Sequence, residues 1–193
     1  MSLDRVGGKG DGGIDLRGWW NLPDPAETSS RTNPRRIRVL AQCKAEKVRP
    51  GPRLIREMEG VARREHDLGQ ERSTGSSDLD VAAPNSIVAL LCSRSGFSSA
   101  AVIEANRSRI PTLLLHIPFD YEAELMSRHQ PIIHAVDHEL LDSLPRMVRG
   151  AFWNAAMMGT RGVLGNEWEV RKEFAQGVED DFEIKIHCNG RPI

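Results

Sequence analysis

Alternating apolar and polar positions predict two β-strands near the start of the chain, at residues 14–20 and 37–47. The segment between them, residues 23–36, is rich in Pro, Ser, Thr, Asn and Asp, which is typical of a loop. We therefore expect the two strands to form an antiparallel hairpin with a long connection.

An apolar stripe with helical spacing follows this hairpin. Pro50 and Pro52 open the predicted helix, whose stripe consists of Leu54, Ile55, Met58, Val61 and Ala62. The helix should pack on the sheet with this stripe and turn four arginines outward, namely Arg53, Arg56, Arg63 and Arg64. Residues 69–80 have few apolar side chains and are predicted to form a loop.

A strand, a helix and a second strand are predicted next, at residues 86–92, 97–109 and 112–117. A crossover of this kind implies parallel pairing in a sheet that is covered on both faces, so the fold class is expected to be α/β. Weaker patterns suggest a strand at residues 131–136, a helix at 137–150 and a last strand at 182–187.

The composition is that of a soluble globular chain, with 39% apolar and 27% charged residues among 193. No apolar run approaches the length of a membrane span. Three cysteines are too few for a disulfide framework and indicate a reducing compartment. The amino terminus has the pattern of neither a secretory signal nor an organellar transit peptide, so the protein is untargeted or its start is missing.

The net charge of −1 hides an uneven distribution. Residues 31–72 carry twelve Lys and Arg against six Asp and Glu, whereas residues 118–193 carry eight against thirteen. The basic segment is either a solvated face or a surface for nucleic acid.

A glycine-rich stretch at residues 8–13 matches the pattern GxGxxG formally. In dinucleotide-binding folds this motif must follow a strand and open a helix, whereas here it precedes a strand. We interpret the glycines as a tight bend that brings Asp11 close to Asp15.

Candidate chemistry lies on the two strands of the hairpin. Because side chains alternate along a strand, Gln42 and Lys44 should share one face while Cys43 lies on the other. In the first strand, Asp15 and Arg17 are expected to share a face opposite Ile14 and Leu16. A carboxylate, an amide and an ammonium group can thus meet at one spot.

Phosphodiester hydrolysis requires such a set of groups. Mg²⁺ takes oxygen ligands and binds substrate phosphate through one or two carboxylates, so Asp15 with an amide oxygen suffices to hold it. Lys44 would orient or deprotonate the attacking water and offset charge on the phosphorane. A structural role remains open, in which Lys44 and Asp15 form an interior ion pair and Gln42 satisfies the remaining hydrogen bonds.

The residues GDGGID (10–15), VLAQCK (39–44) and the helix 52–60 ending in Glu-Gly resemble the Mrr-type (type IV) restriction endonuclease domain of the PD-(D/E)xK nuclease superfamily. LCSRSGFSSAA (91–101) and the following strand look like its downstream part. The resemblance implies a restriction-endonuclease-like fold with a central mixed sheet flanked by helices. It divides the chain into a nuclease core at residues 1–117 and a family-specific carboxy-terminal extension at 118–193.

By this resemblance, Asp15 corresponds to the metal-binding Asp, Gln42 to a position where many relatives carry Glu or Asp, and Lys44 to the catalytic Lys. Asp11 and Gln42 support the metal site for Mg²⁺ or Mn²⁺. The implied activity is that of a DNA endonuclease with Asp15, Gln42 and Lys44 as catalytic residues. We expect double-stranded DNA as the partner, bound through Arg49, Arg53 and Arg56, and no membrane. A homodimer is left open, and the alternative is a non-catalytic DNA-binding or structural protein.

Two further segments, GWWNLP (18–23) and AFWN (151–154), resemble the fungal mitochondrial required-for-respiratory-growth proteins. This resemblance implies a mitochondrial location and a part in respiratory growth. Relatives begin with an acidic helix and a strand ahead of the glycine motif, which residues 1–6 are not expected to supply. We therefore expect an amino-terminally truncated chain in which Ile14, Leu16 and Trp20 are only partly shielded.

Other candidate sites carry less weight. His134 and His138 are four residues apart, but Asp137 is predicted to cap a helix between them, so a zinc site is not expected. Cys43 is expected to be a small core residue. Core or interface positions are expected for the four tryptophans, which are Trp19, Trp20, Trp153 and Trp168.

Overall fold

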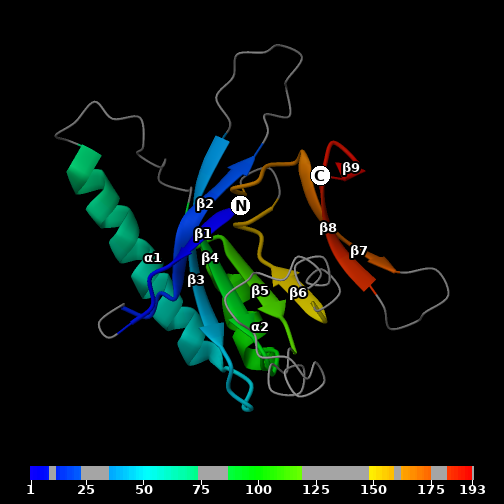
Figure 1. The fold of residues 1–193 in the computed structure, drawn as a ribbon, viewed down its shortest axis with the longest axis horizontal. Coiled ribbons are helices and arrows are strands. Elements are labelled where there is room, and N and C mark those ends of the chain that lie inside the picture. The colour runs from blue at the N-terminus through cyan, green and yellow to red at the C-terminus, as the bar shows by residue number, and fades with distance from the viewer. Residues whose placement is uncertain are drawn as a thin grey trace, which may run out of the picture.

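A computed structural model of the chain describes residues 1–8, 12–22, 35–73, 87–118, 148–158, 162–174 and 182–192. Its centre is a mixed sheet with the strand order β1-β2-β3-β4-β5-β6 (Figure 1). The strands are β1 (Ser2–Arg5), β2 (Leu16–Leu22), β3 (Arg35–Lys44), β4 (Ile87–Ser93), β5 (Thr112–His116) and β6 (Gly150–Trp153). Strands β3, β4 and β5 are parallel, and the other neighbours pair antiparallel.

Two helices connect the parallel strands and cover one face of the sheet. Helix α1 (Pro52–Ser73) links β3 to β4, and α2 (Ser99–Arg107) links β4 to β5. Right-handed crossovers that step in one direction across a sheet place both helices on the same face. Ser98 caps α2, since its hydroxyl accepts a hydrogen bond from the Ala101 amide. The α/β class and the mixed sheet flanked by helices are confirmed.

The face beneath the helices contains the first core cluster. The predicted stripe of α1 packs here against apolar residues of the sheet such as Leu40, Leu91 and Leu114. Burial of this stripe is the main reason that the segment forms a helix, because amphipathic packing contributes more than intrinsic propensity.

The opposite face contains the second core cluster. Val39 and Ala41 alternate with Leu40 and therefore point to this side, where Met157, Leu164 and Trp168 cover them. A small second sheet adjoins this cluster, and Figure 1 shows it on the side of the main sheet away from α1. Its strands are β7 (Trp168–Phe174), β8 (Phe182–Cys188) and β9 (Arg191–Pro192).

Asn154, the residue after β6, forms side-chain hydrogen bonds with three segments of the chain. Its side-chain oxygen accepts hydrogen bonds from the amides of Thr112 and Met157, both at 3.1 Å. Its side-chain nitrogen donates to the carbonyls of Ala105, Ser108 and Ile110. The amide is 1% exposed and all its hydrogen-bonding capacity is used, so it fixes β5 to the end of α2.

The expectation that residues 1–6 supply no strand is wrong. β1 pairs with β2 in the register Leu3↔Gly18, and a Cβ at Gly18 would overlap the Ser2 carbonyl oxygen. Glycine at this position thus allows the close approach of β1. The related expectation of poor shielding is wrong for Ile14 and Trp20, which are 1% and 6% exposed, whereas Leu16 is partly buried.

The loop predicted at residues 69–80 begins later than expected. Residues 69–73 continue α1, because the good helix formers after Gly69 outweigh the cost of one glycine. The strand predicted at 131–136, most of the helix predicted at 137–150 and the pair His134 and His138 lie outside the described residues. Gly150 itself begins β6. No described helix is both long enough and apolar enough to cross a membrane.

Candidate functional site

Asp15 lies at the entrance to β2, where Ile14 separates it from a turn of two glycines. Gly12 and Gly13 have φ values of 66° and 85°, in the left-handed region that glycine adopts at low cost. The Asp15 amide donates to the Ala41 carbonyl, and its Oδ2 accepts a 2.7 Å hydrogen bond from the backbone N–H of Cys43. The carboxylate is thus fastened to β3 between the two candidate residues of that strand, Gln42 and Lys44.

The predicted alternation along β3 is confirmed at Gln42, whereas that before β2 is wrong. Gln42 lies on the face opposite Cys43, as expected; this face is the one beneath α1, and Gln42 is 9% exposed. Ile14 and Leu16, however, belong to opposite core clusters, so they do not share a face. The reason is that β2 begins only at Leu16, and the glycine turn has not yet reached regular pleating at Ile14.

A cavity of about 290 Å³ separates Gln42 from α1. Besides apolar residues it is lined by Gly13, Glu57 and Arg64. A Cβ at Gly13 would lie 3.4 Å from the Gln42 side-chain nitrogen, so the glycine turn forms one wall close to the amide.

Glu57 is a candidate residue that the sequence reasoning missed. It adds a carboxylate from α1 to the cavity that Gln42 lines. Glu57 and Arg64 lie four residues before and three residues after Val61 of the apolar stripe, so both flank the stripe on the side of Val61. This flanking row is the signal that could have identified Glu57. Asp11 lies outside the described residues.

Lys44 ends β3 and begins a polar row across the carboxyl edge of the sheet. It is paired in register with Ser93 of β4, which is paired with His116 of β5. Register partners project to the same face, so the three residues share the face of Gln42. This row could not be predicted from a local pattern, because its members are separated by about 50 and about 20 positions along the chain.

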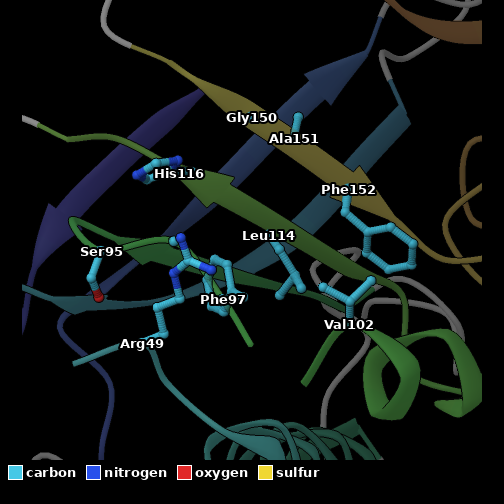
Figure 2. Close-up of a pocket in the computed structure, with 10 residues that line it drawn as sticks. Arg49, Ser95, Phe97, Val102, Leu114, His116, Gly150, Ala151 and Phe152 are labelled. Atoms are coloured by element: carbon cyan, nitrogen blue, oxygen red, sulfur yellow. The ribbon is translucent and has the colours of Figure 1, made fainter. Parts of the chain in front are cut away.

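The row ends at a second cavity, of about 280 Å³, between β5, β6 and α2 (Figure 2). Phe97, Leu114 and Phe152 provide apolar walls, and Arg49 and His116 provide polar groups. Figure 2 shows Arg49 reaching toward Phe97 from the connection between β3 and α1. The cavity therefore combines apolar walls with a cationic side chain.

The three arginines expected to bind DNA lie in two places. Arg49 lines the second cavity, whereas Arg53 and Arg56 project from the first turns of α1. Arg53 pairs with Glu57 at 2.7 Å, and Arg56 pairs with Glu104 of α2 at 3.2 Å. The arginines off the stripe are exposed, as predicted for this helix.

A second basic cluster, missed by the sequence reasoning, surrounds Trp19 on β2. The guanidinium groups of Arg36 and Arg38 lie 4.4 Å and 4.9 Å from the centre of its ring, which are cation–π distances. Burial lowers the pKa of Arg38, and the positive charge of Arg17 lowers it further. Arg17 in turn forms a 2.8 Å ion pair with Glu65 of α1.

Cys43 is exposed, so the expectation of a small core residue is wrong. It projects toward the second cluster, but at the end of β3, beyond the residues that cover this face. A hydrogen bond with the Cys92 thiol lowers the pKa of Cys43 to about 7, while burial and the Asp15 charge act in the opposite direction. The same hydrogen bond raises the pKa of Cys92.

No group of three or more His, Cys, Asp or Glu residues converges as a metal site within the described part of the chain. Gln42 and Glu57 line the same cavity, whereas the Asp15 carboxylate is held at the backbone amide of Cys43.

A family model described as "Required for respiratory growth protein 7" matches residues 1–137. The chain belongs to this family. A protein of Schizosaccharomyces pombe described as uncharacterized and mitochondrial is 40% identical over 60 residues, which are 31% of this chain and 22% of that protein. The match thus spans less than a quarter of that relative. No solved structure matches the chain. Membership of the respiratory-growth family and the mitochondrial relative confirm the expected mitochondrial location.

Proposed function

We propose that the protein is a Mg²⁺-dependent DNA endonuclease of the Mrr type with a restriction-endonuclease-like fold. The observation that carries the proposal is the hydrogen bond from the Cys43 amide to Asp15, because it holds a carboxylate against β3 between Gln42 and Lys44. A role in maintaining mitochondrial DNA would connect this activity with respiratory growth.

The donor groups around Gln42 fit a hard divalent cation. Asp15 accepts the hydrogen bond of the Cys43 amide at Oδ2, and its Oδ1 would be the atom that binds the cation. Gln42 adds an amide oxygen, Glu57 a second carboxylate, and Asp11 is expected to assist. Mg²⁺ keeps several waters and needs only one or two protein carboxylates. When bound, the ion supplies positive charge that stabilises the developing charge on the phosphate oxygens.

Lys44 would act on the attacking water. It shares the face of Gln42 and lies at the carboxyl edge of the sheet, where a phosphate can approach. Either its ammonium group would orient the water and offset negative charge on the phosphorane, or its neutral amine would accept the water's proton. The water would then attack phosphorus in line with the leaving oxygen.

DNA contacts are assigned to the basic segment of residues 31–72. Arg53 is exposed on the first turn of α1. Arg49 lines the same cavity as His116, and His116 belongs to the polar row that begins with Lys44. Arg49 and Lys44 therefore lie at the same edge of the sheet. Phosphate contacts of this kind position a duplex without reading its sequence.

Cleavage is tested with supercoiled plasmid and Mg²⁺ or Mn²⁺. The wild-type chain should nick the plasmid, whereas Lys44→Ala and Asp15→Asn should lower the rate by more than about 100-fold. Both variants should bind duplex DNA as the wild type does, because other residues contact the phosphates. Equal nicking by all three proteins would refute the assignment of these residues.

Binding is tested by titrating duplex DNA at several salt concentrations without Mg²⁺. The affinity should fall with a log–log slope of about −0.9 per phosphate contacted. Arg53→Glu should reduce this slope, whereas Arg171→Glu is the charge-matched control because Arg171 lies on β7 in the second sheet. Affinity that does not depend on salt would contradict the DNA interface.

A non-catalytic DNA-binding protein is the second candidate. The amide of Gln42, where nuclease relatives carry a carboxylate, favours it, since an amide holds Mg²⁺ less firmly than a carboxylate does. Gln42→Glu distinguishes the two functions. If the wild-type chain is a nuclease, Gln42→Glu should lower the Mg²⁺ concentration that nicking requires. If only the Gln42→Glu variant nicks DNA, the natural chain is a non-catalytic DNA-binding protein.

A further inference from the structure

Cys43 and Cys92 face each other across the parallel strands β3 and β4. They are direct partners in the strand register, so both thiols project to the same face. A hydrogen bond joins the two side chains. Of the chain's three cysteines, all of which are free thiols, only Cys43 is exposed, and Cys92 lies half-buried beside it.

The spacing of paired strands suits a disulfide at this position. Neighbouring strands lie about 4.7–4.9 Å apart, and the Cα atoms of disulfide-bonded cysteines lie about 4.4–6.8 Å apart. Because the two residues are already in register, bond formation requires rotation of the side chains rather than a change in strand pairing. Because Cys43 is exposed, a small oxidant can reach it, and the half-buried Cys92 can then form the disulfide with it.

We propose that Cys43 and Cys92 form a peroxide-responsive dithiol that closes to a reversible intramolecular disulfide. Hydrogen peroxide transfers an oxygen atom to the Cys43 sulfur; the O–O bond breaks, and sulfenic acid and one water form. The Cys92 sulfur then attacks the Cys43 sulfur. The S–O bond breaks, the S–S bond forms, and the hydroxyl group leaves with the Cys92 proton as a second water.

The disulfide would fasten β3 to β4 next to Gln42 and Lys44, on the other face of the strand. Its formation depends only on the two thiols and holds whether or not the chain cleaves DNA. A dithiol such as dithiothreitol would restore the reduced form by exchange. Cys188, at the end of β8, is the internal reference thiol because it belongs to the second sheet.

The test treats the reduced full chain with hydrogen peroxide, blocks the remaining thiols with N-ethylmaleimide and measures the intact mass. The treated wild type should take up one maleimide instead of three, and dithiothreitol should restore three. Trypsin should release residues 39–44 linked to residues 73–94. Cys188→Ser should form the same link, whereas Cys43→Ser and Cys92→Ser should form none.

Two results would overturn the proposal. The first is a treated chain in which Cys43 stops at sulfenic or sulfinic acid without a link to Cys92. The second is a link that forms no faster in the folded chain than in the chain unfolded in urea, because the folded register is what brings the thiols together. Circular dichroism of each serine variant verifies that it is folded.

Discussion

The Oδ2 atom of Asp15 lies 2.7 Å from the backbone nitrogen of Cys43, which joins the start of one strand to the end of its neighbour. One oxygen of the carboxylate thus has a structural partner, and the other is the oxygen that we propose as a ligand of the cation. Substitutions of Asp15 that keep the hydrogen-bond acceptor and substitutions that remove it should therefore differ in their effect on stability.

Asp15→Ala should destabilise the fold by about 1–2 kcal/mol because the Cys43 amide loses its acceptor. Asp15→Asn should stay close to the wild type in stability, since the Asn oxygen can accept the same hydrogen bond. Urea unfolding followed by circular dichroism measures both. A similar loss in the two variants would show that the charge rather than the acceptor stabilises this corner.

Asn154 should be among the residues least tolerant of substitution. Asn154→Ala removes five hydrogen bonds and leaves buried backbone groups unsatisfied, so a loss of about 3 kcal/mol or more is expected. Asn154→Asp should be at least as harmful because a carboxylate would face three carbonyls. Ile103→Ala, at an exposed position of α2, is the control and should change the unfolding free energy by less than about 0.5 kcal/mol.

The pair Arg17–Glu65 should couple more strongly than the pair Arg53–Glu57. The first pair is 33% and 21% exposed, whereas the second is 88% and 52% exposed and freely solvated. Double-mutant cycles with glutamine should give about 0.5–1 kcal/mol for Arg17–Glu65 and about 0.3 kcal/mol for Arg53–Glu57. Equal coupling energies would mean that burial beneath α1 does not strengthen the pair.

Gly13 and Gly12 form a matched pair for testing the wall of the Gln42 cavity. Alanine at either position should cost about 1–2 kcal/mol because both have positive φ. Only Gly13→Ala places a Cβ near the Gln42 side chain, whereas Gly12→Ala meets no atom within 4 Å. If the proposed nuclease is active, Gly13→Ala should therefore lower nicking more than Gly12→Ala does at equal stability. Gly60→Ala, within α1, should instead stabilise by about 0.5–1 kcal/mol.

The sequence predicted the structure correctly where one repeat of apolar residues determines which face of a strand or helix is buried. Alternation placed Gln42 and Lys44 on one face of β3 and Cys43 on the other, and the 3.6-residue stripe from Leu54 to Ala62 predicted the buried side of α1. β1 was missed because four largely polar residues carry no such period, and its pairing depends on the missing Cβ of Gly18.

The candidate site was predictable only in part, for a related reason. Gln42 and Lys44 come from β3 and Asp15 from the segment that leads into β2, so hairpin pairing brings Asp15 to β3, and alternation places Gln42 and Lys44 on one face. Glu57 reaches the cavity from a helix and Cys92 reaches Cys43 through a crossover. Both relationships depend on tertiary packing that no local pattern contains.

The parallel pairing of β3 with β4 has a consequence for how the chain folds. The register Arg38↔Ile87 joins residues about 50 positions apart, so the inner strand of the sheet cannot pair on its second edge until the whole crossover has been synthesised. The chain loses conformational entropy on loop closure before the contacts between β3 and β4 can stabilise it, and this makes folding slow for a domain of this size. During that interval the apolar segment Val39 to Ala41 stays available to other chains, and a molecular chaperone that binds extended apolar segments would protect it.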